Sequence, residues 1–114
     1  IPLSARPDVA RELTGLVPLR HTWYLAELAV QPEHRSKGLA RLLIRERLRH
    51  MDRLATHAIM RVSESDNRSK QMYLDLGFED MGVYMEVPGP RVDGEVRADR
   101  RLFLHRVLSQ VDLS

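Results

Sequence analysis

The segment from Trp23 to Val30 has the sequence WYLAELAV, in which Glu27 is the one charged residue. Gln31-Pro32 follows at once, and a proline disfavours helix in the residue before it. An apolar run of this length without alternation is typical of a strand buried on both faces. The sequence therefore predicts a strand in the middle of a sheet.

A long amphipathic helix is predicted from Gly38 to about Ala55. Eight apolar residues fall within one half of its helical wheel: Leu39, Ala40, Leu43, Ile44, Leu48, Met51, Leu54 and Ala55. The other half carries a stripe of arginines: Arg41, Arg45, Arg49 and Arg53. Arg47 falls inside the apolar arc, where a snorkelling side chain can keep its charge in water. We expect the apolar half to pack on the sheet.

A second strand and a second, shorter helix are predicted next along the chain. His57–Ser63 has the composition of a strand. Asp66 or Asn67 can cap a helix over residues 68–76, and Gly77 stands where a glycine commonly ends a helix.

The last part of the chain predicts two strands, Gly82–Val87 and Arg101–Leu108, joined by a loop from Pro88 to Asp99. The complete order is then strand, helix, strand, helix, strand, strand. This order predicts an α/β fold with a mixed sheet. Its first two strands are parallel across a helical crossover, and its last two form an antiparallel hairpin.

The composition excludes several classes of protein. Hydrophobic residues are 43% and charged residues 30% of the chain, and the net charge is only +2. This profile is that of a globular domain with no nucleic-acid or membrane partner, and the arginine stripe is then a solvated helix face. Cysteine is absent, which is compatible with a reducing cytoplasm, and the five histidines lack metal-ligand spacing. We expect a cytoplasmic protein without a metal.

The turn between the first strand and the long helix has the form Arg-x-x-Gly-x-Ala, from Arg35 to Ala40. Gly38 allows the backbone to approach a ligand closely, and the free N–H groups of a helix start attract anions. Arg35, Lys37 and Arg41 add positive charge around the same place. Alone, this short pattern is better explained by a tight turn with solvated charges; together with a second motif it indicates a pyrophosphate site.

Two motifs in the expected order resemble those of the GNAT superfamily of acyl-CoA N-acyltransferases. The first resembles motif A and is Leu28-Ala29-Val30-Gln31-Pro32-Glu33-His34-Arg35-Ser36-Lys37-Gly38-Leu39-Ala40-Arg41-Leu42-Leu43. The second, about 35 residues further on, resembles motif B and is Asp66-Asn67-Arg68-Ser69-Lys70-Gln71-Met72-Tyr73-Leu74-Asp75-Leu76-Gly77-Phe78. The resemblance covers residues 23 to about 108.

The resemblance implies a binding site for acetyl-CoA as the acyl donor. Its pantetheine arm would lie along the first strand, at Leu28, Ala29 and Val30. Its pyrophosphate would be held by backbone amides of the loop and helix start: Arg35, Ser36, Lys37, Gly38, Leu39, Ala40 and Arg41. The second helix would face the cofactor arm and thioester with Asp66, Asn67, Ser69 and Tyr73.

Tyr73 matches the tyrosine that the family uses as a general acid, and a phenol can protonate the thiolate that leaves when an amine attacks a thioester. A tyrosine packed on the sheet is the structural alternative. Glu27 is the candidate general base, because burial in an apolar run raises the pKa of a carboxyl group. A salt-bridged edge residue is an equal alternative, and a water molecule can also deprotonate the amine. Tyr24 and Glu64 lie near the expected cleft.

Motif B departs from the family at one position, since Asp66 stands where asparagine is usual. An ionised carboxylate cannot donate a hydrogen bond to pantetheine. Either Asn67 takes over that contact, or Asp66 caps the helix and the contact is lost.

The family fold has a first half that precedes Trp23. We therefore expect residues 1–22 to be a linker or loop remnant, with a helical stretch at Asp8–Leu16, and residues 23–114 to be an incomplete GNAT-like domain. A completing N-terminal segment or a homodimer would supply the rest. Acetyl transfer to a primary amine of a small molecule or protein is the expected function. The alternative is a non-catalytic CoA-binding module.

Overall fold

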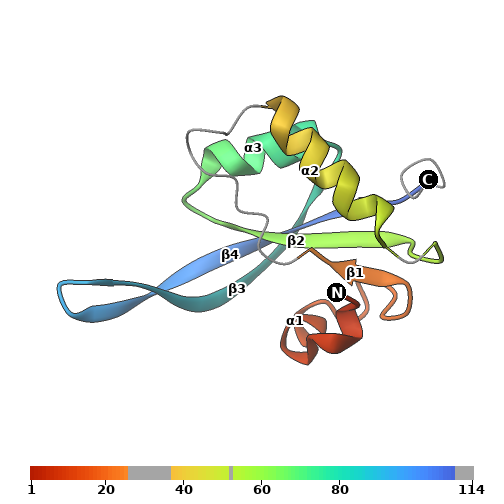
Figure 1. Cartoon of the computed structure of the whole chain (residues 1–114). Coiled ribbons are helices and arrows are strands. Elements are labelled where there is room, and N and C mark those ends of the chain that lie inside the picture. The colour runs from red at the N-terminus through yellow and green to blue at the C-terminus, as the bar shows by residue number, and fades with distance from the viewer. Residues whose placement is uncertain (26–36, 52, 110–114) are drawn as a thin grey trace.

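The computed structural model describes residues 1–25, 37–51 and 53–109 of the chain. Its strands form one mixed sheet in the order β1-β2-β4-β3, with helices on both faces (Figure 1). In chain order the elements are η1 (Leu3–Ala5), α1 (Pro7–Glu12), β1 (Thr22–Tyr24), α2 (Lys37–Arg49), β2 (His57–Ser63), α3 (Asn67–Asp75), β3 (Glu79–Val92) and β4 (Glu95–Val107).

The strand directions are those predicted from the order of the elements. Strand β1 pairs with β2 in parallel, and Tyr24 lies opposite Ile59. Strand β4 is antiparallel to both of its neighbours, β2 and β3, and Met60 of β2 lies opposite Leu104. The α/β fold with a mixed sheet and the bounds of β2 are therefore confirmed.

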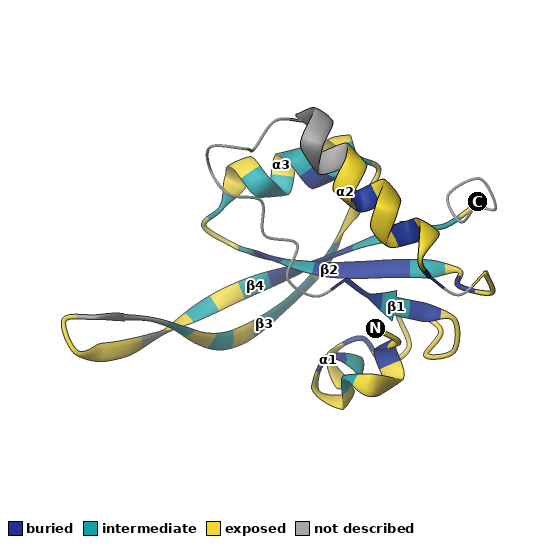
Figure 2. Cartoon of the chain, in the orientation of Figure 1, coloured by how far each residue is buried: buried dark blue, intermediate teal, exposed yellow. Residues whose placement is uncertain are grey.

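One face of the sheet is covered by α2 and α3 and forms the larger core, which we call the helical face (Figures 1 and 2). Alternate residues of each strand point toward it, as the geometry of a strand requires. Its buried side chains are Leu25, Ile44, Leu48, Met51, Ala55, Ala58, Met60, Val62, Tyr73, Phe78, Leu102 and Leu104.

The opposite face is covered by the first residues of the chain, and we call it the N-terminal face. Leu3, Val9 and Leu13 are each at most 1% exposed and pack against three strand residues: Tyr24, Ile59 and Phe103. Residues 1–22 thus form packed structure where a linker or loop was predicted, and α1 is shorter than the helix expected at residues 8–16. This segment has too few apolar residues to show a helical period in the sequence. They are buried nevertheless, because the apolar side chains of the sheet pack against them.

The N-terminal residues also reach the outer edge of β1. Pro2 forms an antiparallel bridge with Trp23, and the backbone N–H of Tyr24 donates to the Ile1 carbonyl at 2.8 Å. The Ile1 amino group in turn donates to the Tyr24 carbonyl at 3.0 Å. Strand β1, predicted in the middle of a sheet, is therefore at the edge of the described four-stranded sheet, where Ile1 and Pro2 pair with its outer side.

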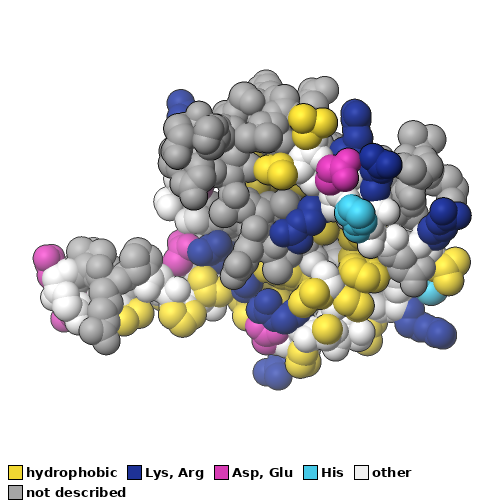
Figure 3. Space-filling model, in the orientation of Figure 1, with side chains coloured by type: hydrophobic (Ala, Val, Ile, Leu, Met, Phe, Trp, Pro, Cys, Tyr) yellow, Lys and Arg dark blue, Asp and Glu magenta, His cyan; other side chains and the backbone are white. Residues whose placement is uncertain are grey.

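The predicted loop from Pro88 to Asp99 is wrong, because β3 and β4 continue through it as a long hairpin. The hairpin extends from the rest of the molecule as an arm (Figures 1 and 3). Asp93 and Gly94 both have positive φ and turn the chain between the strands, as a two-residue hairpin loop requires. Pro88 is tolerated because β3 is an edge strand, where a missing N–H can face solvent.

Helix α2 begins one residue before its predicted start and ends at Arg49, six residues before the predicted end. The backbone N–H groups of His50 and Met51 donate three residues back along the chain, which tightens the final turn. Met51 and Ala55 are buried after the helix ends, whereas Leu43 and Leu54, which were placed on the same apolar half, are exposed.

Candidate active site

The start of α2 contains the central part of the first motif. Lys37, Gly38, Leu39 and Ala40 form the first turn of the helix, and Arg41 follows. The first N–H groups of any α-helix have no partner within the helix and carry a partial positive charge. Ile44 and Leu48 are buried and fix α2 against the sheet, so the position of its first turn is set by the core.

Several predicted site residues lie outside the described residues: Glu27, Leu28, Ala29, Val30, Arg35 and Ser36. Their roles as base, pantetheine contact and pyrophosphate contact therefore stay predictions.

The sequence left open whether Asp66 or Asn67 caps the second helix, and in the structure Asp66 is the cap of α3. Its Oδ1 accepts the backbone N–H of Ser69 at 3.0 Å, and its Oδ2 accepts the Ser69 hydroxyl at 2.7 Å. Asn67, the first residue of the helix, is exposed. Both oxygens of the Asp66 carboxylate thus stabilise the helix start, which is typical of an N-cap.

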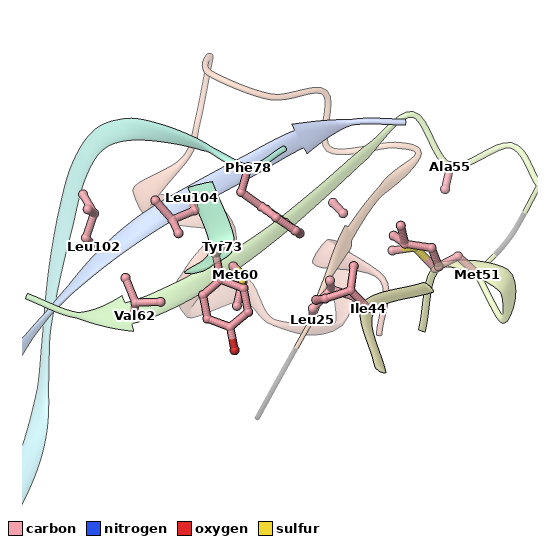
Figure 4. Close-up of a cluster of buried hydrophobic side chains, with 12 residues drawn as sticks. Leu25, Ile44, Met51, Ala55, Met60, Val62, Tyr73, Phe78, Leu102 and Leu104 are labelled. Carbon is pink, nitrogen blue, oxygen red and sulfur yellow. The ribbon is translucent and has the colours of Figure 1, made fainter. Parts of the chain in front are cut away.

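Tyr73 lies on α3 and is buried on the helical face, with 5% of its surface exposed. Its ring meets Phe78 edge to face, with centroids 6.2 Å apart and an interplanar angle of 76°. Figure 4 shows the ring beside Met60 and Val62, with its hydroxyl oxygen directed away from the labelled side chains. Gly77, at φ 93°, ends the helix and lets the chain turn so that Phe78 reaches the same core.

Tyr24 and Glu64, both expected near the cleft, lie in different environments. Tyr24 is buried on the N-terminal face, and its hydroxyl accepts a hydrogen bond from Arg61 Nε at 2.6 Å. Glu64 is exposed and pairs with Arg100 at 3.3 Å. Arg61 was missed by sequence reasoning, although a lone charge within the apolar strand His57–Ser63 is a signal that could have found it.

The structure places α2 and the second motif on one side of the sheet. Tyr73, Ile44 and Leu25, the last described residue of the first strand, belong to the same buried cluster. Chemically, this side offers helix N–H groups for an anion and one buried phenol as a proton donor.

Within the described part of the chain, no helix is long and apolar enough to cross a membrane. The same residues contain no group of three or more His, Asp or Glu side chains placed to hold a metal ion.

The family described as Acetyltransferase (GNAT) domain matches residues 7–92 of this sequence. The match includes both motifs and most of the sheet, and it begins at α1, within the segment that the sequence alone assigned to a linker. The chain therefore belongs to the GNAT acetyltransferase family.

Solved structures of N-acetyltransferases share this fold. One is a spermidine N-acetyltransferase SpeG chimera from Vibrio cholerae and hSSAT, with 18% identity and a TM-score of 0.54 over 85% of this chain and 55% of that chain. Another is the ribosomal-protein-S18-alanine N-acetyltransferase from Escherichia coli, with 22% identity and a TM-score of 0.55 over 75% and 54%. A putative phosphinothricin N-acetyltransferase has 22% identity and a TM-score of 0.51 over 70% and 49%.

This chain spans about half the length of those structures. No curated protein is similar enough to the sequence to be matched with it.

Proposed function

We propose that this protein is an N-acetyltransferase that transfers the acetyl group of acetyl-CoA to a primary amine of a small molecule or protein. One observation carries the proposal: Tyr73 is buried on the same face of the sheet that α2 covers. In this arrangement a proton donor and a set of helix N–H groups can serve the two ends of one long cosubstrate.

The reaction follows from what these groups can do. The amine nitrogen attacks the thioester carbon, the new C–N bond forms, and the C–S bond breaks. Tyr73 donates its proton to the departing thiolate. The proton lost by the amine goes to water or to Glu27, the candidate base.

The proposed cosubstrate contacts extend from this core. Backbone N–H groups from residue 35 to Arg41 hold the pyrophosphate, and residues 28–30 line the pantetheine arm. Asp66 caps α3 and holds Ser69, so the contact that the family usually makes from the Asp66 position to the arm is lost in this chain. No metal takes part, and a cytoplasmic location fits the absence of cysteine. A completing segment or a second copy would supply part of the acceptor pocket.

Binding of acetyl-CoA is tested with Gly38→Asp. A carboxylate in the first turn favours the helix but repels a pyrophosphate, by roughly 4 kcal/mol for two unit charges about 4 Å apart at an effective dielectric constant of about 20. Calorimetry should show that the variant binds acetyl-CoA far more weakly than the parent chain. Ser4→Asp, which adds the same charge to the exposed Ser4 on the N-terminal face, is the control and should bind normally.

Equal affinity of Gly38→Asp and the parent chain would show that the start of α2 does not hold the pyrophosphate. Thiol release from acetyl-CoA over a panel of primary amines then separates an enzyme from a non-catalytic CoA-binding module. The module would show ligand-induced thermal stabilisation without amine-dependent thiol release.

A further inference from the structure

Arg61 lies half-buried on β2, on the N-terminal face of the sheet. Its Nε donates to the Tyr24 hydroxyl at 2.6 Å, and its Nη1 lies 3.5 Å from the Met85 sulfur. The guanidinium carbon is 5.4 Å from the centroid of the Tyr24 ring. Two uncharged neighbours thus set the orientation of this cation, and donors on Nη1 and Nη2 remain for a further acceptor.

Two other arginines on this face differ from Arg61 in having a carboxylate. Arg6 forms a two-pronged contact with Asp8, at 3.1 Å for each prong, and this hydrogen bonding lowers the pKa of Asp8 to about 2. Arg101 Nε lies 2.7 Å from Asp99 Oδ2, although that ion pair lacks the angle of a hydrogen bond. Within the described residues, no carboxylate forms an ion pair with Arg61.

A half-buried charge without a counter-charge is costly, since burial removes water that would stabilise it. Stacking on Tyr24 offsets part of that cost but supplies no negative charge. An anionic ligand would complete the arrangement.

Arg61 follows Ile59 by two residues along β2, and the Ile59 carbonyl accepts the Leu25 N–H of the neighbouring strand at 2.9 Å. Its sequence neighbours Met60 and Val62 belong to the helical face, in the cluster that contains Tyr73. Arg61 and Tyr73 therefore flank the same stretch of β2 from opposite faces.

We propose that Arg61 binds the carboxylate of the acceptor, so that the substrate class is a small molecule carrying both a primary amine and a carboxylate. This inference rests on the proposed function. The acetyl group moves to the amine, as above, and the carboxylate is unchanged by the reaction. Its role is to orient the acceptor from the N-terminal face while Tyr73 acts from the helical face. Tyr24 is a positioning residue, because it acts through Arg61.

The activity experiment compares matched acceptors with the full chain. Glycine, β-alanine and 4-aminobutanoate are each assayed by thiol release against the corresponding carboxamide. A charge-assisted contact predicts that kcat/KM for the best acid exceeds that for its amide by about 10- to 100-fold. Arg61→Gln should abolish this preference, and Tyr24→Phe should reduce it. Arg101→Gln is the matched control on the same face and should retain it, because Arg101 already has a carboxylate partner.

A binding experiment tests the site without turnover. N-acetylglycine, N-acetyl-β-alanine and 4-acetamidobutanoate, each with its carboxamide, are titrated into labelled chain while the Nε–H resonance of Arg61 is followed by NMR. The resonance is assigned by its loss in Arg61→Gln. At least one acid should shift it and bind about tenfold more tightly than its amide.

Equal binding of acids and amides, with no movement of the Arg61 resonance, would overturn the inference and leave Arg61 as a packing partner of Tyr24. Acid binding through Arg61 in a chain that acetylates no amine would overturn the acceptor role and the proposed function, but not the carboxylate site. Transfer to amines with no preference for acids would overturn the inference alone.

Discussion

The two faces of the sheet use the same strands for different purposes. Met60 and Val62 of β2 lie under α2 and α3 in a large apolar cluster, while Ile59 and Arg61 face the N-terminal residues. The helices α2 and α3 cover the helical face and bury Ile44, Leu48 and Tyr73 against it. The N-terminal face is covered by η1 and the short α1, whose buried apolar residues are few.

The difference follows from how much chain covers each face. Phe103 and Ile59 are fully buried by the N-terminal segment, whereas Arg61, Ser63 and Arg101 are partly exposed on the same face toward the end of β2. Polar groups can collect there because water or a ligand can still reach them. The helical face supplies an apolar core that contains the buried phenol of Tyr73, and the N-terminal face supplies charge.

The largest expected effect is on turnover, at Tyr73 on the helical face. Phenylalanine retains the ring and its contact with Phe78 but removes the proton donor, and loss of a general acid costs about 100- to 10,000-fold in rate. Steady-state kinetics should therefore show a large fall in kcat, with the affinity for acetyl-CoA nearly unchanged. Tyr84→Phe removes a hydroxyl from a tyrosine packed against the same cluster and should leave kcat unchanged. Near-normal turnover in Tyr73→Phe would make Tyr73 a packing residue.

The next effect is on stability, at Leu13 on the N-terminal face. Leu13 is 1% exposed, so Leu13→Ala should lower the free energy of unfolding by about 2–5 kcal/mol, as measured by denaturant titration. The exposed Leu16 is the matched control, and Leu16→Ala should change the free energy of unfolding by less than about 0.5 kcal/mol. If both variants unfold like the parent chain, residues 1–22 are the loop that the sequence predicted. The N-terminal face would then have no core of its own.

A smaller loss is expected at the start of α3. Asp66→Ala removes the N-cap and should cost about 0.5–2 kcal/mol of stability. Asp66→Asn should be nearly neutral, since asparagine caps a helix about as well as aspartate. A loss of equal size in both variants would mean that the charge of Asp66, and not its cap, stabilises the helical face. Chemical denaturation of the three proteins in parallel decides between these cases.

The smallest effect is a pH dependence from His57, which precedes Ile59 by two residues and so points toward the N-terminal face. Burial, with a contribution from the nearby His105, lowers the pKa of His57 below its ordinary value of 6.5. In the window below 6.5 the unfolded chain binds more protons than the folded one, so acidification favours unfolding. The stability present above pH 6.5 is thus lost as the pH falls toward the folded pKa. Melting temperatures between about pH 7.5 and 5.5 should fall less in His57→Gln than in the parent chain. An identical slope in both would contradict the assignment.

Local pattern alone was enough to predict several elements. Strand β2 lies at the residues expected for it, and Gly77 ends α3 as predicted. These features depend on residues near one another in sequence: the composition of a short run, an acceptor three residues from its donor, and a glycine free to take positive φ. The two motifs that indicated the family are of the same local kind.

Contacts between distant residues decided the rest. The burial of Leu3 and Val9 requires Phe103, and the hydrogen bond between Tyr24 and Arg61 spans 37 residues. Likewise, Pro88 can sit in a strand only because β3 is at the edge of the sheet, which is a property of strand order. Sequence periodicity indicates which residues are buried. The surface that buries them, and the charge that has no ion-pair partner, depend on how distant parts of the chain pack together.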